Sequence, residues 1–509
     1  MIMENFAPIM FAGLVVTMLI GFPVAFSLAF LGLLCGFFAI SMDWFPASFM
    51  SNLPLNVFGI LSNDLLLAIP FFTFMGAILE KCGLAEDMLD SMGQLFGPVK
   101  GGLGYSVIIV GFILGAITGT VAGQVIAMAL ISLPVMIRYG YNMRYATGVL
   151  AASGTITQLV PPSLVLVVMA DQLGRSVGDM YKGAWGPSML QVGIFALYTF
   201  ALSIIKPAYV PGVPKEARTL NGWALWAKCL RGIIPSAFLI FAVLGSMGGL
   251  PGINTAIATP TEAGAMGCVG ALFLAALHKR LDKDLIWEAM HSTMRLTAMV
   301  VFILIGSRVF SMVFQGVDGA KWVEHLLSGL PGGQVGFLIV VNVFIFFLAF
   351  FLDFFEIAFI ILPMLGPVAE KMGIDMVWFG VLLCVNMQTS FMHPPFGFAL
   401  FYLRGIADTL FKEGRIEKPV KSNDIYMGAI PWVIMQLVLV VIVIFVPETV
   451  TMFLDKEEKV DLDKVVIEMP SEQEVPAAEL KPEAAKPSAA DAAAAAAEEQ
   501  KKIDDLFKK

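Results

Sequence analysis

The sequence "TQLVPPSLVL" at residues 157–166 interrupts a long apolar stretch with two adjacent prolines, and "SFMHPPFGFAL" at residues 390–400 does the same later in the chain. These are the only two Pro-Pro pairs in the 509 residues. Proline removes a backbone donor, and its ring clashes with the preceding helical turn. The two stretches therefore predict two helices that are broken within apolar surroundings.

The sequences around the two pairs also match. "GYNM" at 140–143 precedes the first pair at the same spacing as "GIDM" at 373–376 precedes the second. Each pair is also followed by a similar motif, "DMYKGAWGP" at 179–187 and "DIYMGAIPW" at 424–432. Landmarks in the same order and nearly the same register indicate an internal duplication. We place the two halves at residues 51–205 and 285–447.

The composition indicates a membrane protein. The chain is 58% hydrophobic and 14% charged, whereas soluble proteins carry roughly 25% charged residues. Apolar stretches of the length that spans a bilayer, about 20 residues, recur up to about residue 447. We predict an all-α polytopic membrane protein that does not bind nucleic acid. The enzyme motifs HExxH, Walker A, GxSxG and GxGxxG are absent from the sequence, which argues against a membrane enzyme and against ATP-driven transport.

The basic residues indicate how the halves are oriented. Short cytoplasmic loops are enriched in Lys and Arg. Of the 32 basic residues, 18 fall in segments that can all lie on the cytoplasmic side of the membrane. Arg308 falls within a helix. With those residues inside, segments 104–137 and 335–370 must each enter and leave the membrane on one side. They enter from opposite sides, which predicts two inverted repeats, each with a re-entrant hairpin, a pattern typical of transporters.

Four further segments complete the predicted organisation. The N-terminal segment forms one or two membrane helices, broken near "GFPVAF" at 21–26, and a cytoplasmic linker joins the two halves of the chain. The tail carries 15 acidic and 9 basic residues from Asp455 onward; we expect it to be disordered and, by crossing parity, on the side opposite the cytoplasm, in the periplasm. The N-terminal helices, the linker, the helices after it and the tail occupy residues 1–50, 206–231, 232–284 and 448–509.

The first half offers a hairpin tip and a broken helix as a candidate site. The tip, "GAITGTVAGQ" at 115–124, combines hydroxyl side chains with glycines that permit unusual backbone angles; the alternative is close helix packing. Hydroxyls and freed carbonyls are hard oxygen donors that suit a hard cation. The candidates are Thr118, Gly119 and Thr120 at the tip, with Ser153, Gly154, Thr155, Thr157, Pro161 and Ser163 in the broken helix.

The second half offers a matching set. Asp353 and Glu356 lie in "FFLDFFEIAF" at 350–359, where a carboxylate is costly and indicates function; the alternative is a helix cap at a wet tip. His393 is the one histidine in an apolar segment and either binds a substrate carboxylate, titrates, or is satisfied by a neighbour. The broken helix contributes Asn386, Gln388, Thr389, Ser390, His393 and Pro394.

Four stretches carry a family resemblance. They are "AIPFFTFMGAILEKCGLAEDM", "GYNMRYATGVLAASGTITQLVPPS", "GLPGINTAIATPTEAGAMG" and "MHPPFGFALFYLRG". Together they resemble the large membrane subunit of tripartite ATP-independent periplasmic (TRAP) transporters, over about residues 5–447. The resemblance implies an elevator-type ion transporter fold in the bacterial inner membrane, driven by sodium and without a covalent cofactor. It also implies two partners: a small four-helix membrane subunit and a periplasmic binding protein that delivers an organic acid.

The resemblance also implies roles for the candidate residues. Sodium would bind at Thr118, Gly119, Thr120, Ser153, Gly154, Thr155 and Pro161 in one half, and at Asp353, Asn386, Gln388, Thr389 and Pro394 in the other. The organic acid would lie between them, near Thr157, Ser163, Glu356, Ser390 and His393. The sequence departs from the family pattern at its Thr-Gly-Thr tip, at His393 and at the acidic "DFFE". An ion-independent channel or facilitator on the same fold is the alternative.

Overall fold

The computed structural model describes residues 6–454 except 119, 215, 217, 219–221, 254, 351, 395 and 396, and the side chains of Ile117, Thr118 and Ser328 are likewise not described. Every regular element in the described part is helical. The predicted tail lies outside the described residues, apart from 448–454, where a short helix α21 (Glu448–Thr451) forms.

Apolar helices of membrane-spanning length dominate the described chain. Seven of them are long and apolar enough to cross a membrane, or eight if a bent pair counts as one span. This confirms the polytopic all-α prediction. The seven are α2 (Val24–Ser41), α7 (Val121–Arg138), α10 (Val177–Ile205), α11 (Trp223–Ser246), α12 (Pro260–Leu277), α13 (Lys283–Gly316) and α20 (Ser422–Phe445).

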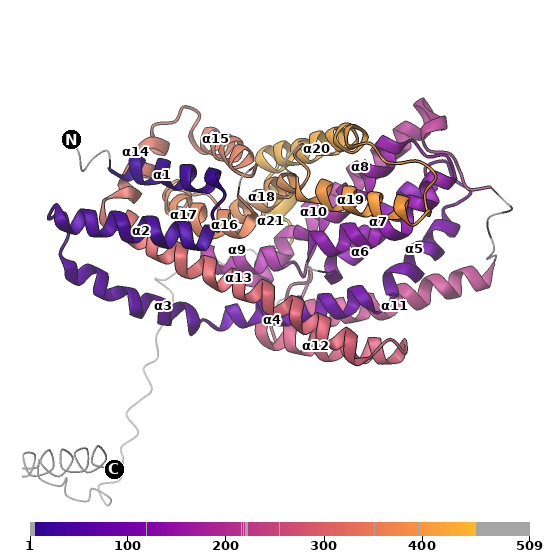
Figure 1. Ribbon diagram of the computed structural model, residues 1–509, viewed down its shortest axis with the longest axis horizontal. Helices are drawn as coiled ribbons and strands as arrows, with labels where there is room; N and C mark the ends of the chain where they lie inside the picture. The colour runs from indigo at the N-terminus through magenta and orange to yellow at the C-terminus, as the bar shows by residue number, and fades with distance from the viewer. Residues whose placement is uncertain are drawn as a thin grey trace, which may run out of the picture. The chain divides into compact units, whose positions relative to one another are not determined.

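One group of packed helices is built around the 34-residue helix α13, which contacts α2 and α4 (Asp64–Lys81), while α4 contacts α12 (Figure 1). Glycines allow the closest crossing. A Cβ on Gly306 of α13 would lie 2.3 Å from the Ala25 carbonyl oxygen, and one on Gly32 of α2 would lie 2.9 Å from the Phe310 nitrogen. Small residues let membrane helices approach in this way. We call α2, α4, α11, α12 and α13 the scaffold group.

A second group contains the segments predicted as hairpins and the two broken helices. The first hairpin segment forms α6 (Gly102–Thr118) and α7, which pack on each other and on α8 (Met143–Thr155). The second forms α15 (Gly333–Leu348), a short α16 (Phe354–Glu356), a π-helix η5 (Ile357–Ile361) and α17 (Leu362–Lys371). We call these helices, with α8, α9, α10, α18, α19 and α20, the core group.

Both predicted helix breaks are present, and they are built alike. Helix α8 tightens into a 3-10 turn, η2 (Ile156–Gln158), before Pro161, and α9 (Leu164–Leu173) begins after it. Helix α18 (Met376–Met387) likewise tightens into η6 (Gln388–Phe391) before Pro394, and α19 (Phe398–Lys412) follows. The side chains of Asn142 and Asp375, which hold equivalent positions ahead of the two Pro-Pro pairs, cap α8 and α18.

The remaining helices connect these groups. Helix α11 begins at Trp223, inside the segment predicted as a cytoplasmic linker, because the apolar pattern of the helix starts before its two basic residues, Lys228 and Arg231. The N-terminal segment forms two helices, separated at Gly21 with φ 90°. The others are α1 (Phe6–Ile20), η1 (Ala47–Asn52), α3 (Leu53–Leu61), α5 (Leu84–Leu95), η3 (Pro207–Tyr209) and α14 (Gly319–Ser328).

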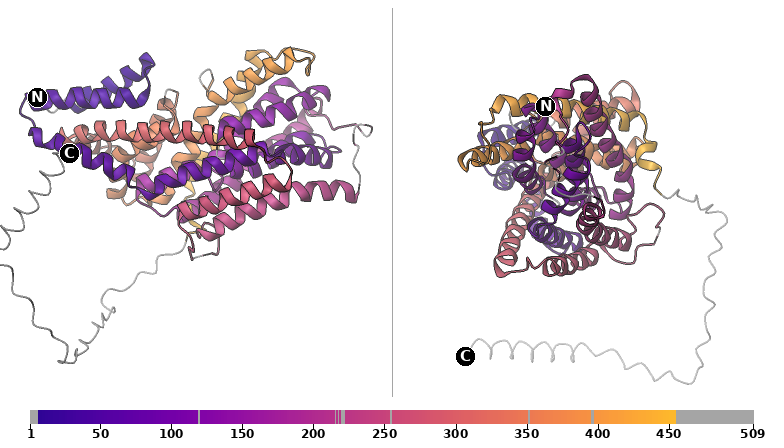
Figure 2. Two further views of the ribbon diagram at one scale, coloured as in Figure 1. Left: turned by 60° about the horizontal axis from the view of Figure 1, so that its bottom comes forward. Right: turned by 90° about the vertical axis from the view of Figure 1, so that its right-hand side faces the viewer.

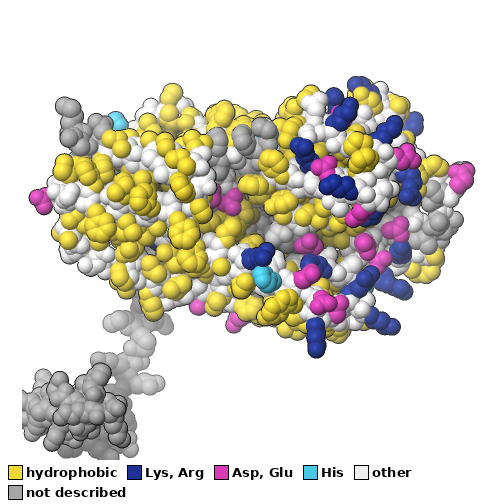
Figure 3. All heavy atoms as spheres, in the orientation of Figure 1, with side chains coloured by type: hydrophobic (Ala, Val, Ile, Leu, Met, Phe, Trp, Pro, Cys, Tyr) yellow, Lys and Arg dark blue, Asp and Glu magenta, His cyan; other side chains and the backbone are white. Residues whose placement is uncertain are grey.

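The surface separates apolar from basic regions. Large hydrophobic side chains such as Ile205, Phe238 and Phe273 are exposed, as expected of a lipid-facing surface. On the face in Figure 3, Lys and Arg side chains gather toward one end, where Figure 1 places α5 and α11. Figure 2 shows from two further sides that α11 and α12 lie along one flank of the described helices. The charge distribution agrees with a membrane protein that has a basic side.

Candidate functional site

Gln124 of α7 connects the first hairpin to the first broken helix. Its Nε2 donates to the Gly111 carbonyl (2.6 Å) in α6 and to the Ser153 carbonyl (2.8 Å) in α8. The Thr157 hydroxyl hydrogen-bonds to Gln124 Oε1 and to the Gly154 carbonyl (2.7 Å). All three side chains, those of Gln124, Ser153 and Thr157, are buried. The structure therefore brings Ser153, Gly154 and Thr157 together behind the hairpin tip.

Two glycines make this junction possible. A Cβ on Gly111 would lie 2.7 Å from the Cβ of Ser153, and one on Gly154 would lie 2.1 Å from Val125 Cγ2. Real side chains do not reach such distances, so both positions require glycine. At the tip itself, Thr120 is the N-cap position of α7 without a side-chain capping bond. Gly119 lies outside the described residues, and nothing is described for the Thr118 side chain.

Asn386 connects the second hairpin to the second broken helix. Its Nδ2 donates to the Asn342 carbonyl (2.8 Å) in α15, and Asn342 Nδ2 donates to the Leu338 carbonyl (2.8 Å). The amide oxygens of both Asn342 and Asn386 are buried and have no hydrogen-bond partner among the described residues. A buried polar atom without a partner is costly. Amide oxygens are also ligands that hard cations accept, so these two fit a cation such as sodium.

Two glutamines join the halves through equivalent contacts. Gln191 of α10 and Gln388 exchange hydrogen bonds through their amides (2.7 and 3.0 Å). Gln436 of α20 donates to the Thr155 hydroxyl (3.0 Å). Gln191 and Gln436 hold equivalent positions relative to the repeated downstream motif, and Thr155 and Gln388 hold equivalent positions ahead of their Pro-Pro pairs. Each broken helix is thus held by a glutamine from the other half.

Asp353 and Glu356 form a reciprocal cap at the start of α16. Asp353 Oδ1 accepts from the Glu356 backbone nitrogen (3.1 Å), and Glu356 Oε2 accepts from the Asp353 backbone nitrogen (3.0 Å). Both carboxylates therefore act as helix caps, the alternative considered from the sequence. Helix α16 packs against α9 and α13. Among the described residues, no hydrogen bond joins either carboxylate to Asn386 or His393, so the predicted second ligand set is not assembled here by direct contacts.

His393 lies between aromatic rings. Its ring centroid is 4.1 Å from that of Phe346, edge to face, and 4.4 Å from that of Phe350, stacked. The side chain is buried, and neither ring nitrogen has a hydrogen-bond partner among the described residues. An imidazole that packs against two phenyl rings, with neither nitrogen paired within the described chain, can offer both nitrogens to a ligand.

The other predicted hydroxyls are engaged with the backbone. Ser163 donates to the Gln158 carbonyl (2.6 Å) and caps α9 by accepting from Val165. The hydroxyls of Thr389 and Ser390 donate to carbonyls three residues earlier, those of Asn386 and Met387. These bonds fix the 3-10 turn before the prolines and leave the hydroxyl oxygens as acceptors. Pro161 and Pro394 follow these turns directly, as predicted.

Four amides at this junction were missed from the sequence: Gln124, Gln191, Asn342 and Gln436. Each interrupts an apolar helix, for example in "VVNVFIFF" and "IMQLVLVV". A single amide in a membrane helix is a usable signal because it needs a partner there.

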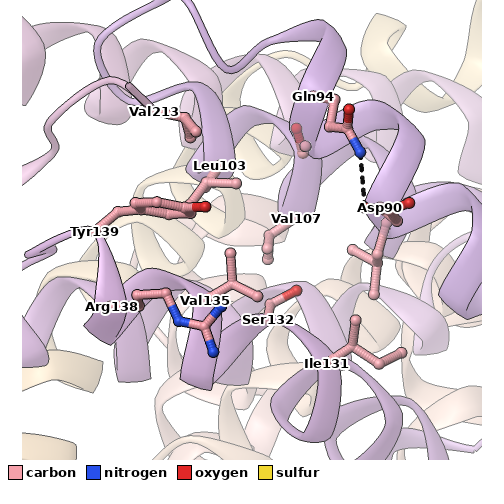
Figure 4. A pocket seen from close by; sticks show the side chains of 13 residues that line it. Asp90, Gln94, Leu103, Val107, Ile131, Ser132, Val135, Arg138, Tyr139 and Val213 are labelled. Atoms are coloured by element: carbon pink, nitrogen blue, oxygen red, sulfur yellow. Dashed lines mark hydrogen bonds between the residues drawn. The ribbon is translucent and has the colours of Figure 1, made fainter. Parts of the chain in front are cut away.

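A cavity of about 240 Å³ opens at the base of the first hairpin rather than at its tip (Figure 4). Asp90 and Gln94 of α5 face Ser132 and Arg138 of α7 across it, and Gln94 donates to Asp90 (3.1 Å). None of the predicted site residues lines it. Within the described chain, no group of three or more His, Cys, Asp and Glu side chains is placed to hold a metal ion.

The described helices and paired breaks are those of a polytopic transporter subunit. A family model described as "Tripartite ATP-independent periplasmic transporter, DctM component" matches residues 11–449, and the chain belongs to this family. This confirms the resemblance inferred from the motifs.

Named relatives agree with the family. The C4-dicarboxylate TRAP transporter large permease protein DctM of Rhodobacter capsulatus is 29% identical over 87% of this chain and 97% of that protein. The 2,3-diketo-L-gulonate TRAP transporter large permease protein YiaN of Escherichia coli is 27% identical, over 85% and 95%. A solved structure of the Alcanivorax borkumensis YdaH transporter has a similar fold, with a TM-score of 0.52 and 15% identity over 78% of this chain and 87% of that one. These relatives are transporter permeases, not enzymes.

Proposed function

We propose that the chain is the large transmembrane subunit of a TRAP-type secondary transporter that imports an organic acid, coupled to a sodium gradient, by an elevator mechanism. The observation that carries this proposal is the pair of matched helix breaks, each ending in a 3-10 turn with hydroxyls and freed carbonyls at its tip. Broken helices at membrane depth line the ion and substrate sites of many secondary transporters.

The contacts between the halves support an inverted duplication. Gln191 contacts the second broken helix and Gln436 contacts the first, at equivalent positions of the two repeats. Such an exchange is expected when a pseudo-two-fold axis relates two halves around a shared site. The basic end in Figure 3 supports a cytoplasmic side there. A moving core group against a fixed scaffold group would then carry the site across the bacterial inner membrane.

The substrate class follows from the relatives. Their names specify a C4-dicarboxylate, 2,3-diketo-L-gulonate and, for a fused DctMQ permease of Oleidesulfovibrio alaskensis, isethionate. All are organic anions. We therefore assign an organic acid as the substrate, delivered by a periplasmic binding protein. We expect a small four-helix membrane subunit as the second partner, which is a separate chain for relatives that are not fused.

The test of sodium coupling needs no substrate. Purified protein, with its small subunit when the two co-purify, is unfolded thermally in sodium chloride and in matched potassium or choline chloride. A ligand that binds the folded state raises the unfolding midpoint with concentration. We expect a sodium-specific rise that Thr120→Val and Asn386→Ala abolish. Thr409→Val is the control, because Thr409 is exposed on α19 and bonds only its own helix among the described residues.

The outcomes separate the proposal from its alternative. Equal midpoints in all three salts would contradict sodium coupling and favour an ion-independent channel or facilitator. That alternative is then tested by uptake into vesicles with and without a sodium gradient, in the presence of both partners. Uptake that only follows the acid's own gradient would identify a facilitator.

A further inference from the structure

A polar cavity of about 250 Å³ lies where α3, α4, α9, α13 and the π-helix meet, away from the site described above. The cavity is smaller than most ligand pockets, which measure about 300–1,000 Å³, so it would admit only a small molecule. None of the predicted sodium or substrate residues lines it. Its polar lining includes the side chains of Asn63, Asp171, Gln172, Arg308, Ser311 and Gln315.

Arg308 is the cation of this cavity. It lies in the apolar helix α13, eight residues before the helix ends at Gly316, which is about 12 Å along the helix axis at 1.5 Å per residue. A charged residue within a membrane helix is costly and faces a cavity or a partner. Among the described residues, no carboxylate lies within ion-pair distance of Arg308, and no hydrogen bond to its guanidinium is found. Its charge is therefore open to an anion.

The acidic side chain that lines the cavity is already satisfied. Asp171 Oδ1 accepts from Asn63 Nδ2 (2.9 Å), and Asp171 Oδ2 accepts from Gln172 Nε2 (2.8 Å). Two neutral amides thus hold the carboxylate in place of Arg308. Asn63 also caps α4, whose N-terminus lies at the same cavity. The positive end of a helix dipole favours an anion.

The polar residues of α13 share one face. Arg308, Ser311 and Gln315 follow one another at three and four residues, a spacing that aligns side chains along a helix, and all three line the cavity. Arginine binds a carboxylate through two parallel hydrogen bonds. The hydroxyl and amide beside it can hydrogen-bond the remaining polar groups of a small acid.

We propose that this cavity is a second anion-binding site, in which Arg308 binds the carboxylate or sulfonate of a small organic acid. The cavity lies between the scaffold and core groups: Ser307 of α13 donates to the Phe359 carbonyl in the π-helix (2.9 Å), which begins directly after Glu356. An acid held there would contact helices of both groups. The claim that the bound acid is the transported acid rests on the proposed function. The preference of the cavity for anions does not depend on that function.

Cysteine reactivity tests the anion preference directly. Ser311→Cys is introduced into the full chain in a Cys35→Ser background, because Cys35 is partly exposed while the other four cysteines are buried. The rate of modification is measured with an anionic sulfonatoethyl methanethiosulfonate and with a neutral methyl methanethiosulfonate. We expect Arg308→Gln to lower the anionic-to-neutral rate ratio at least about threefold, since an isolated charge concentrates counter-ions nearby.

The matched control is Arg175→Gln. Arg175 is an exposed arginine outside this cavity that pairs with Glu370 (3.8 Å), and its removal leaves the ratio at Ser311→Cys unchanged. A ratio that Arg308→Gln does not alter would overturn the proposal. Arg308→Lys keeps the charge and preserves the ratio, which separates electrostatics from a folding defect.

Protection identifies the source of the anion. Millimolar succinate or isethionate is expected to slow modification by the neutral reagent several-fold, and Arg308→Gln to remove this protection. Protection by phosphatidylglycerol nanodiscs alone, relative to phosphatidylcholine, would assign the cavity to a lipid headgroup and overturn the acid assignment. No protection by any of these anions would also overturn it. Failed sodium coupling with intact protection would refute the proposed function and leave this site standing.

Discussion

Gln191 and Gln388 show at the residue scale how the halves depend on each other. Both amides are buried, and each donates to the other across the boundary between the two predicted halves. Removing one partner leaves a buried amide unsatisfied, which costs about 1–3 kcal/mol. The pair therefore fixes the 3-10 turn of the second break relative to α10.

A double-mutant cycle tests this pair. We expect Gln191→Leu and Gln388→Leu each to lower the free energy of unfolding by about 1–3 kcal/mol. The double variant should lose clearly less than the sum, because no amide is then left without a partner. Gln334→Leu, at an exposed amide that bonds the Met372 carbonyl, is the control. Additive losses in denaturation would show that the two amides do not act as a pair.

Thr157 supports a second prediction at this scale. Its hydroxyl contacts both Gln124 and the Gly154 carbonyl, so Thr157→Val should lower stability by roughly 1–2 kcal/mol. Thr157 itself is a predicted substrate contact, but its bond holds Gly154, a predicted sodium ligand, so the substitution should also weaken the sodium-dependent rise in the unfolding midpoint. Thr293→Val is matched to it, since Thr293 is part-buried and bonds only a carbonyl of its own helix in the described chain. An unchanged sodium response in Thr157→Val would separate this threonine from ion binding.

The sequence predicted the two helix breaks more successfully than it predicted the ligand residues. Pro161 and Pro394 determine where α8 and α18 end because proline has local consequences that need no tertiary information. The bonds of Asp353 and Glu356 are local to the first turn of α16, and their Asp-x-x-Glu spacing matches a capping box. The sequence left open whether the two carboxylates also bind a ligand. Asn342 was missed because its role requires knowing that α15 faces Asn386.

At the scale of elements, glycines set how closely helices approach. A Cβ on Gly148 of α8 would lie 2.3 Å from the Gly428 carbonyl oxygen of α20, and one on Gly428 would lie 2.3 Å from the Arg144 carbonyl oxygen. Each glycine thus touches the backbone of the opposite helix. This contact holds the first broken helix against the last helix of the second half.

Enlarging this contact should separate the two helices. We expect Gly148→Val to lower the thermal unfolding midpoint strongly, since overpacking costs about 1–3 kcal/mol and here the neighbour is backbone that cannot rotate away. Gly193→Val in α10 is the control, because nothing lies within 4 Å of its added Cβ. Both substitutions place a β-branched residue in an α-helix. Equal midpoints for the two variants would contradict the close crossing.

The sequence predicted the broken helices and hairpin segments but not their partners. The spacing between "GYNM" and the first Pro-Pro pair involves neighbouring residues only, so it predicts where α8 and its 3-10 turn lie. The pairing of α8 with α20, and of α10 with α18, joins segments hundreds of residues apart. Helix α11 begins at Trp223, inside the segment assigned to the linker, where basic residues suggested a loop while the apolar pattern continues.

At the scale of the whole molecule, polar contacts between described residues join the scaffold group to the core group. Asn63 of α4 donates to Asp171 of α9 (2.9 Å), and Ser307 of α13 donates to the Phe359 carbonyl. Within the core group, Arg144 of α8 pairs with Asp424 of α20 (3.0 Å). An elevator mechanism requires contacts of the first kind to break during transport, while contacts of the second kind persist.

Crosslinks at these positions test the mechanism. In Asn63→Cys/Asp171→Cys, oxidation or a short bifunctional thiol reagent should abolish acid uptake into vesicles that contain both partners, and reduction should restore it. The same treatment of Arg144→Cys/Asp424→Cys should leave uptake intact, because α8 and α20 move together. Since each variant is compared with its own reduced form, loss of Asp171 from the Arg308 cavity does not affect the comparison. Full uptake by the oxidised Asn63→Cys/Asp171→Cys protein would show that α9 does not slide past α4, and the elevator proposal would then fail.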